Sequence, residues 1–136
     1  IVGPRDDVDP ALLRHPNVEW VGAVPHDKLP LEAERADVLV MPYADMPATR
    51  AMQPLKLLEY LATGLPVVVT PLPATRSWSD AMDLAATPEA FVAAVVARIS
   101  GGLPDDQRRA RARLVGESWK AKADQFERLC LSDEGP

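Results

Sequence analysis

The sequence is poor in the residues that build cross-linked or metal-bound frameworks. Its 136 residues include a single cysteine, Cys130, and two histidines. One cysteine cannot close a disulfide within the chain or build a cysteine-based zinc site. Long apolar runs are also missing: none approaches the ~20 residues that span a bilayer, and no secretory signal opens the chain. These absences favour a globular domain with an ordinary hydrophobic core in a reducing compartment.

An excess of positive charge is missing as well. Lysine and arginine number 15 against 20 aspartates and glutamates, which gives a formal net charge of -5. Domains that bind nucleic acid usually present a basic face. Four arginines gather at positions 108, 109, 111 and 113, but acids and alanines surround them, which indicates a solvated helix face. We therefore expect no nucleic-acid partner.

The first residues have the character of a core strand and lack an initiator methionine. The chain opens on Ile1-Val2-Gly3-Pro4. Apolar strand residues are uncommon at a natural terminus, because termini tend to be exposed. We therefore expect a piece of a longer protein, with a domain that is incomplete at its N-terminus.

Short apolar runs alternate with helical stretches along the chain. This pattern is typical of a parallel sheet covered by helices on both faces, so we predict a doubly wound α/β domain over residues 1–131. The expected strands are 1–3, 18–24, 38–41, 67–69 and 82–86. The expected helices are 11–14, 25–36, 54–63, 88–100 and 105–131. Residues 132–136 are predicted to form a disordered tail.

Local signals sharpen some of these predictions. The run 38–41 is apolar throughout, which is typical of a strand buried on both faces. Pro54 stands where the first residue of a helix favours proline, and Gly64 is placed to end that helix. Thr87, followed by proline and glutamate, is a strong start signal for the helix 88–100.

The segment that carries chemistry is the loop 44–53 with the helix that follows it. Ligands of open parallel sheets collect at the carboxyl ends of strands, and free N–H groups with the helix dipole make a helix start an anion site. Lys56 lies in the first turn against the dipole's preference, so it is a candidate phosphate partner. Glu59, three residues on, has the chemistry to accept hydrogen bonds from ribose hydroxyls. Spacing alone favours a plain Lys–Glu pair on a solvated helix face.

A family resemblance changes that balance. Residues 54–68 read PLKLLEYLATGLPVV, which resembles the P-x-K-x-x-E-Y-x-A-x-G-x-P-V-V block of GT-B glycosyltransferases. Flanking pieces follow in the same order: IVGP, NVEWVG, PHDKLP and ADVLVMPY. The chain is similar to the retaining, group 1-like branch, in its C-terminal donor-binding domain. The resemblance implies a Rossmann-like sheet and covers nearly the whole chain.

The resemblance also implies roles for individual residues. Glu59 would bind the ribose hydroxyls of the nucleotide, and the helix start around Lys56 would lie beside the diphosphate. The loop 42–53 would face the donor sugar and the phosphates, and the segment after the second strand would lie near the base. The donor-binding residues implied in this way are Glu59, Lys56, Leu55, Gln53, Pro42, Tyr43, Val24 and Pro25.

The sequence departs from the family pattern in two ways. Many relatives carry a second glutamate eight positions before the first, where this chain has Ala51. The acid that faces the sugar is then missing or supplied by Asp45, which is the catalytic candidate. The basic residues that hold the diphosphate in the family lie upstream of this chain, so we expect the fragment alone to be inactive.

The expected activity is transfer of a glycosyl group, of the hexosyltransferase type, from a nucleotide-diphosphate sugar to an acceptor. A carbohydrate or lipid-linked acceptor would be bound by the N-terminal half outside this chain. No metal or other cofactor is expected to be obligatory. A nucleotide donor implies a cytoplasmic location. Any contact with a membrane surface would be made by the N-terminal half outside this chain. Two alternatives stay open: a non-catalytic module that has lost the donor site, and a nucleotide-sugar epimerase on the same fold.

The expected incompleteness leads to a prediction about folding. In the usual strand order of such sheets the first strand lies in the middle, between the second and the fourth. If that strand is absent, the chain expressed alone should fold poorly or aggregate, because unpaired strand edges promote association. Thermal unfolding followed by circular dichroism tests this, and a sharp cooperative transition would contradict it.

Overall fold

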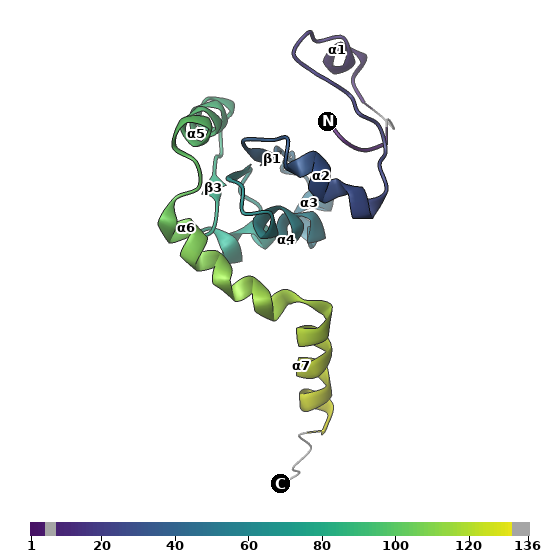
Figure 1. The fold of residues 1–136 in the computed structure, drawn as a ribbon, viewed down its shortest axis with the longest axis vertical. Helices are drawn as coiled ribbons and strands as arrows, with labels where there is room; N and C mark the ends of the chain where they lie inside the picture. The colour runs from purple at the N-terminus through teal and green to yellow at the C-terminus, as the bar shows by residue number, and fades with distance from the viewer. Residues whose placement is uncertain (5–7, 132–136) are drawn as a thin grey trace. The chain divides into compact units, whose positions relative to one another are not determined.

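The computed structural model describes residues 1–4 and 8–131, and the predicted tail 132–136 lies outside them. The chain divides into two compact units, residues 1–36 and the part that begins at Asp37 (Figure 1). The elements in chain order are α1 (Pro10–Leu13), η1 (His26–Lys28), α2 (Leu29–Ala33), β1 (Leu39–Met41), α3 (Pro47–Ala51), α4 (Leu55–Ala62), β2 (Val67–Val69), η2 (Pro73–Trp78), β3 (Asp83–Leu84), α5 (Pro88–Gly101), α6 (Asp105–Ala110), η3 (Arg111–Glu117) and α7 (Trp119–Leu131).

The first unit contains less strand than the sequence predicts. The expected strands 1–3 and 18–24 are reduced to one isolated parallel bridge between Val2 and Gly22. The Gly3 N–H donates to the Gly22 carbonyl at 2.9 Å, and the Val21 N–H donates to the Ile1 carbonyl at 2.9 Å. The prediction of two regular strands is therefore wrong, because each segment finds a backbone partner over only a few residues.

The two helical stretches predicted for the first unit form, but their bounds differ from the predicted 11–14 and 25–36. Helix α1 begins at Pro10, and the Asp9 carboxylate accepts a hydrogen bond from the Ala11 N–H at 2.8 Å. The expected helix 25–36 divides into the 3₁₀ turn η1 and the helix α2. Pro30 explains the division, because proline has no N–H to donate to a carbonyl four residues earlier.

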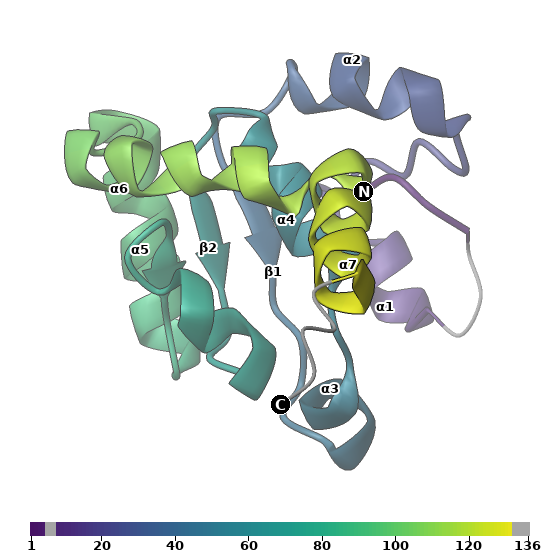
Figure 2. The ribbon, with the colours of Figure 1, turned by 90° about the horizontal axis from the view of Figure 1, so that it is seen from below.

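The second unit contains the parallel sheet that the sequence predicts. Strand β2 lies between β1 and β3 and pairs with both in parallel; Figure 2 shows β1 and β2 side by side. All three valines of β2 have no exposed surface, as their uninterrupted apolar run predicts. Helix α4 connects β1 to β2 and η2 connects β2 to β3, so the α/β fold class is confirmed.

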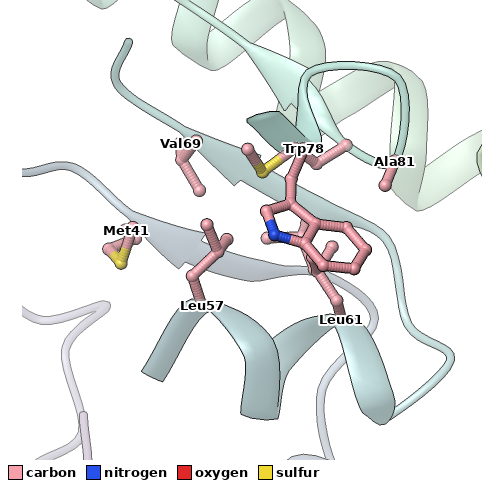
Figure 3. Close-up of a cluster of buried hydrophobic side chains, with 8 residues drawn as sticks. Met41, Leu57, Leu61, Val69, Trp78 and Ala81 are labelled. Carbon is pink, nitrogen blue, oxygen red and sulfur yellow. The ribbon is translucent and has the colours of Figure 1, made fainter. Parts of the chain in front are cut away.

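Helices α4 and α5 cover the two sides of the sheet (Figure 1). Leu57 and Leu61 stand one turn apart on α4 and are buried in a cluster with Val67 and Val69, and Figure 3 shows both leucines pointing from α4 toward the strands. Helix α5 contacts β2. Its start is as predicted, because the Thr87 hydroxyl accepts a hydrogen bond from the Ala90 N–H at 3.2 Å.

Burial of β1 differs from the prediction. Met41 is buried against α4, but Val40 on the opposite face is 42% exposed. The prediction of a strand buried on both faces is therefore wrong for β1. The reason is that α5 packs against β2, the strand with partners on both sides.

The start of α4 also differs from the prediction. Helix α4 begins at Leu55, and Pro54 precedes it as the N-cap residue, with φ -77° and ψ 95°. Pro54 is therefore not the first helical residue, and its carbonyl accepts a hydrogen bond from the Leu57 N–H at 3.0 Å. At the other end Thr63 is the C-cap and Gly64 has φ +79°, the left-handed conformation that glycine adopts most readily.

The predicted single helix over 105–131 is wrong. The segment folds as α6, η3 and α7. Ser118 ends the helical course because its backbone is extended, with ψ 151°, and its hydroxyl accepts a hydrogen bond from the Ala121 N–H at 3.1 Å at the start of α7. A seven-residue 3₁₀ segment thus separates the two α-helices.

Arg111 joins three parts of the second unit. Its guanidinium donates to the carbonyls of Leu61, Leu65 and Ala81 at 3.3, 2.7 and 2.9 Å. These carbonyls belong to the last turn of α4, the turn before β2 and the turn before β3. The residue is 7% exposed, and burial lowers the pKa of Arg111 to about 10. A cation buried in this way ties α4 and both strands to η3.

Replacing Arg111 with methionine should destabilise the second unit strongly. Two buried carbonyls and one partly buried carbonyl would lose their donor, so we expect the free energy of unfolding to fall by about 2–4 kcal/mol. Urea unfolding of the full-length protein measures this. The matched control is Arg109→Met on the exposed surface of α6, which should change stability by less than about 0.5 kcal/mol. Equal effects of the two substitutions would contradict the role of Arg111.

Candidate functional site

The loop between β1 and α4 leaves the carboxyl end of the sheet. It begins at Pro42 and contains the short helix α3, which the sequence does not predict. The Thr70 hydroxyl, directly after β2, donates to the Tyr43 carbonyl at 2.6 Å. The Thr70 N–H donates to the Met41 carbonyl at 3.3 Å. The carboxyl ends of β1 and β2 are therefore tied together, and the loop starts from a fixed position.

Hydrogen bonds within the loop order its short helix. The Thr49 hydroxyl accepts from the Met46 N–H at 3.0 Å and donates to the Ala44 carbonyl at 2.5 Å. Helix α3 also contacts η2, the segment that follows β2. The loop is thus a folded segment with its own cap, supported by the neighbouring connection of the sheet.

The strongest polar contact of the loop is an ion pair between Asp45 and Arg50. The Arg50 Nε donates to Asp45 Oδ1 at 2.5 Å, and the Arg50 Nη2 donates to Oδ2 at 2.7 Å. Hydrogen bonds from Arg50 lower the pKa of the Asp45 carboxyl, and the carboxylate in turn raises the pKa of Arg50. Both residues are exposed. Asp45 is therefore an oriented, ionised carboxylate at neutral pH.

A groove of about 590 Å³ lies at the carboxyl ends of the three strands. Its wall is mostly apolar, and Asp45 brings the charge among the side chains that line it. The Thr87 and Thr70 hydroxyls that reach it are engaged, one as the α5 cap and one with the Tyr43 carbonyl. The lining residues are Pro42, Tyr43, Ala44, Asp45, Thr70, Pro71, Ala86, Thr87, Pro88, Phe91 and Val92.

Helix α4 presents the two charged candidates of the sequence. Lys56 is its second residue and Glu59 its fifth, and both side chains are exposed. Residues three apart share one side of a helix, while Leu57 and Leu61 occupy the buried side. The expected placement of a lysine in the first turn, with a glutamate one turn on, is therefore confirmed.

The other candidates fall in three places. Pro42 and Tyr43 line the groove with Asp45. Gln53 and Leu55 line a separate small cavity of about 40 Å³ beside Trp78. The remaining candidates, Val24 and Pro25, belong to the first unit, where they directly precede η1.

Arg50 is the charged residue of this region that sequence reasoning passes over. It stands in the loop 42–53, which the family resemblance assigns to the donor sugar and the phosphates, five residues after Asp45. The signal that identifies it is an acid and an arginine within one short loop. Their pairing depends on α3, which the sequence does not predict.

Over residues 1–4 and 8–131, no group of three or more histidine, cysteine, aspartate or glutamate side chains is arranged to hold a metal ion. In the same residues, no helix has the length and apolar character to cross a membrane.

A family profile described as "Glycosyl transferases group 1" matches residues 1–101. The chain belongs to this family. The chain is similar to a Bacillus subtilis (strain 168) protein described as "Putative teichuronic acid biosynthesis glycosyltransferase TuaH", with 48% identity over 64 residues. The match covers 47% of this chain and 16% of the relative. Family and relative together support glycosyl transfer as the kind of reaction.

Titration of Asp45 tests the geometry of its ion pair with Arg50. Arg50 stabilises the ionised carboxylate, so the apparent pKa of Asp45 should lie below its ordinary value of 3.8. The pairing should persist above that value and be lost as the pH falls through the lowered pKa. Carboxyl NMR of the full-length protein measures the midpoint. Arg50→Gln should return it to its ordinary value, and an unchanged midpoint in that variant would contradict the pairing.

Proposed function

We propose that the chain is the donor-binding domain of a GT-B-type glycosyltransferase that uses a nucleotide-diphosphate sugar. The observation that carries the proposal is the placement of Lys56 and Glu59 on the exposed side of α4, which follows the loop at the carboxyl end of β1. Family membership supports the glycosyl-transfer part of the proposal. The nucleotide and the roles of individual residues are inferred from the geometry and from the family resemblance.

The diphosphate is assigned to the start of α4. The N–H groups of Leu55 and Lys56 occupy positions that have no acceptor within a helix, and the helix dipole adds partial positive charge there. The Lys56 ammonium brings a full positive charge to the same turn. Positive charge at this place stabilises the nucleotide diphosphate as it leaves the sugar. The helix start and Lys56 supply that charge themselves, so the proposal requires no metal ion.

The ribose is assigned to Glu59 and the donor sugar to the loop. A carboxylate one turn along the helix has two oxygens to accept hydrogen bonds from vicinal hydroxyls. Asp45 lines the groove with Pro42 and Tyr43, which makes it the acid available to the sugar where the chain has Ala51. Val24 and Pro25 are assigned to the base from the resemblance.

The acceptor is assigned to a part of the protein outside this chain. A carbohydrate or lipid-linked acceptor, bound by a companion domain, completes the proposed transfer. The description of the relative names a glycosyltransferase of teichuronic acid biosynthesis, which supports transfer of a glycosyl group to an acceptor. A cytoplasmic location is proposed because the donor is a nucleotide sugar.

A second candidate function has one observation in its favour. Ala51 occupies the position at which the family pattern carries an acid, so the chain could retain the fold and lack a donor site. Such a non-catalytic module would bind no nucleotide diphosphate. The two functions therefore differ in a single binding measurement.

Titration calorimetry of the full-length protein with UDP, GDP and ADP tests the proposal. We expect selective binding of one nucleotide and a loss of about tenfold or more in affinity for Glu59→Ala, because the ribose hydroxyls lose their acceptor. The matched control is Glu127→Ala, an exposed glutamate on α7, which should leave affinity unchanged.

Each outcome of this titration has a meaning. No binding by folded wild-type protein would refute the donor site and favour the non-catalytic module. Binding that responds equally to Glu59→Ala and Glu127→Ala would refute the role of Glu59 and leave a nucleotide site elsewhere.

A further inference from the structure

The loop before α4 contains a cation whose side chain already holds an anion. Arg50 lies in the last turn of α3, and its guanidinium donates two parallel hydrogen bonds to the Asp45 carboxylate, at 2.5 and 2.7 Å. This two-point arrangement is the one with which arginine binds phosphate oxygens. The internal carboxylate therefore occupies the guanidinium in the manner of an oxyanion ligand.

The location of the pair places it at the edge where a donor would lie. Asp45 lines the groove at the carboxyl ends of β1, β2 and β3. Arg50 is followed after only four residues by Leu55, where α4 begins. The loop is positioned at its start by Thr70 and ordered within by Thr49. The pair thus stands on an ordered segment of the chain that runs from the groove residues to the start of α4.

Arg50 is also free to exchange the Asp45 carboxylate for another anion. Both side chains are exposed, with 61% of the Arg50 side chain and 54% of the Asp45 side chain accessible. An ion pair in that setting contributes little to stability, since water competes for both charges. A diphosphate carries more negative charge than one carboxylate and offers several oxygens in place of two. It can therefore displace Asp45 from Arg50 without unfolding any element.

We propose that Arg50 is a second diphosphate-binding residue, which Asp45 holds until a nucleotide diphosphate takes the place of the carboxylate. This inference rests on the proposed donor site and adds a cation to Lys56. Release of Asp45 also leaves both its oxygens open to hydroxyl groups in the groove that it lines. No covalent step is involved: one ion pair is exchanged for another.

The sign of an Asp45→Asn effect separates this role from a purely structural one. If Asp45 competes with the diphosphate, Asp45→Asn should raise affinity for the preferred nucleoside diphosphate by about two- to fivefold, the range that loss of a weak exposed pair allows. Arg50→Ala should lower the same affinity by about tenfold. The affinity of Arg50→Lys should lie between those of the wild type and Arg50→Ala, because an ammonium keeps the charge and loses the two-point geometry.

The experiment is calorimetric titration of the full-length protein with the nucleoside diphosphate and the corresponding monophosphate. The sugar-free nucleotide is used so that contacts of Asp45 with a donor sugar do not enter. In the double variant Asp45→Asn, Arg50→Ala, the gain from Asp45→Asn should vanish, because no guanidinium remains to be released. The loss in Arg50→Ala should be smaller for the monophosphate, which has one phosphate fewer to contact.

A matched surface pair supplies the control. Lys120 and Asp124 form an exposed ion pair at 2.9 Å on α7. Lys120→Ala and Asp124→Asn change the net charge as Arg50→Ala and Asp45→Asn do. Both control variants should leave nucleotide affinity unchanged, which excludes an effect of overall charge.

Three results would overturn the inference. Arg50→Ala with unchanged affinity would show that Arg50 does not contact the diphosphate. A loss of affinity in Asp45→Asn would show that the pair serves to hold the loop in place. A gain in affinity from Asp45→Asn that is also seen in the Arg50→Ala background would show that the carboxylate only repels the diphosphate. In each case an intact Glu59→Ala effect leaves the proposed function standing, whereas absence of all nucleotide binding removes both.

Discussion

Packing of α4 against β2 is the constraint on which the rest of the second unit depends. Val67, Val68 and Val69 have no exposed surface, so both faces of the strand must be covered. Leu57 and Leu61 cover one face, and their position one turn apart determines which side of α4 turns outward. Lys56 and Glu59 are exposed as a consequence. A hydrophobic contact between one helix and one strand thereby orients the polar groups of the candidate site.

Arg111 completes that arrangement from the opposite end of the helix. It binds the carbonyl of Leu61 in the last turn of α4 and the carbonyls of the two turns that lead into β2 and β3. A cation beside the C-terminal carbonyls of a helix is also favourable to the helix dipole. The start of α4 and the loop before it thus project from a helix that is held on its apolar side and at its far end. An anion site gains from such support, because donors fixed in advance need no reorganisation when a ligand arrives.

The loop at the carboxyl end of the sheet combines order with exchangeable charge. Its course is set by hydrogen bonds from Thr70 and Thr49, whereas its charged pair, Asp45 and Arg50, faces water. Uncharged hydrogen bonds at the base of the loop maintain its conformation. The exposed ions are free to respond to a ligand, since solvent already weakens their attraction. This division of roles makes the loop suited to an anionic substrate.

Elements with strong local signals could be predicted from the sequence, and elements that depend on distant partners could not. The β2 valines, the glycine at the end of α4 and the Thr87 cap each act over a few residues, and their predictions are confirmed. The same is true of Lys56 and Glu59, whose placement follows from one helix.

Tertiary contacts decided the remainder. Regular strands over residues 1–3 and 18–24 need more partner backbone than the first unit supplies, and the exposure of Val40 depends on where α5 packs. The division of residues 105–131 follows from the extended Ser118 and from the three carbonyls around Arg111, which come from elsewhere in the chain. Arg50 became a candidate only when α3 brought it to Asp45. The sequence by itself determined the helices α4 and α5, the central strand and the charged face of α4, because those depend on neighbours in the chain. The groove required the fold, because it forms between segments that meet only in the tertiary structure, and the Asp45–Arg50 pair required α3, which the sequence does not predict.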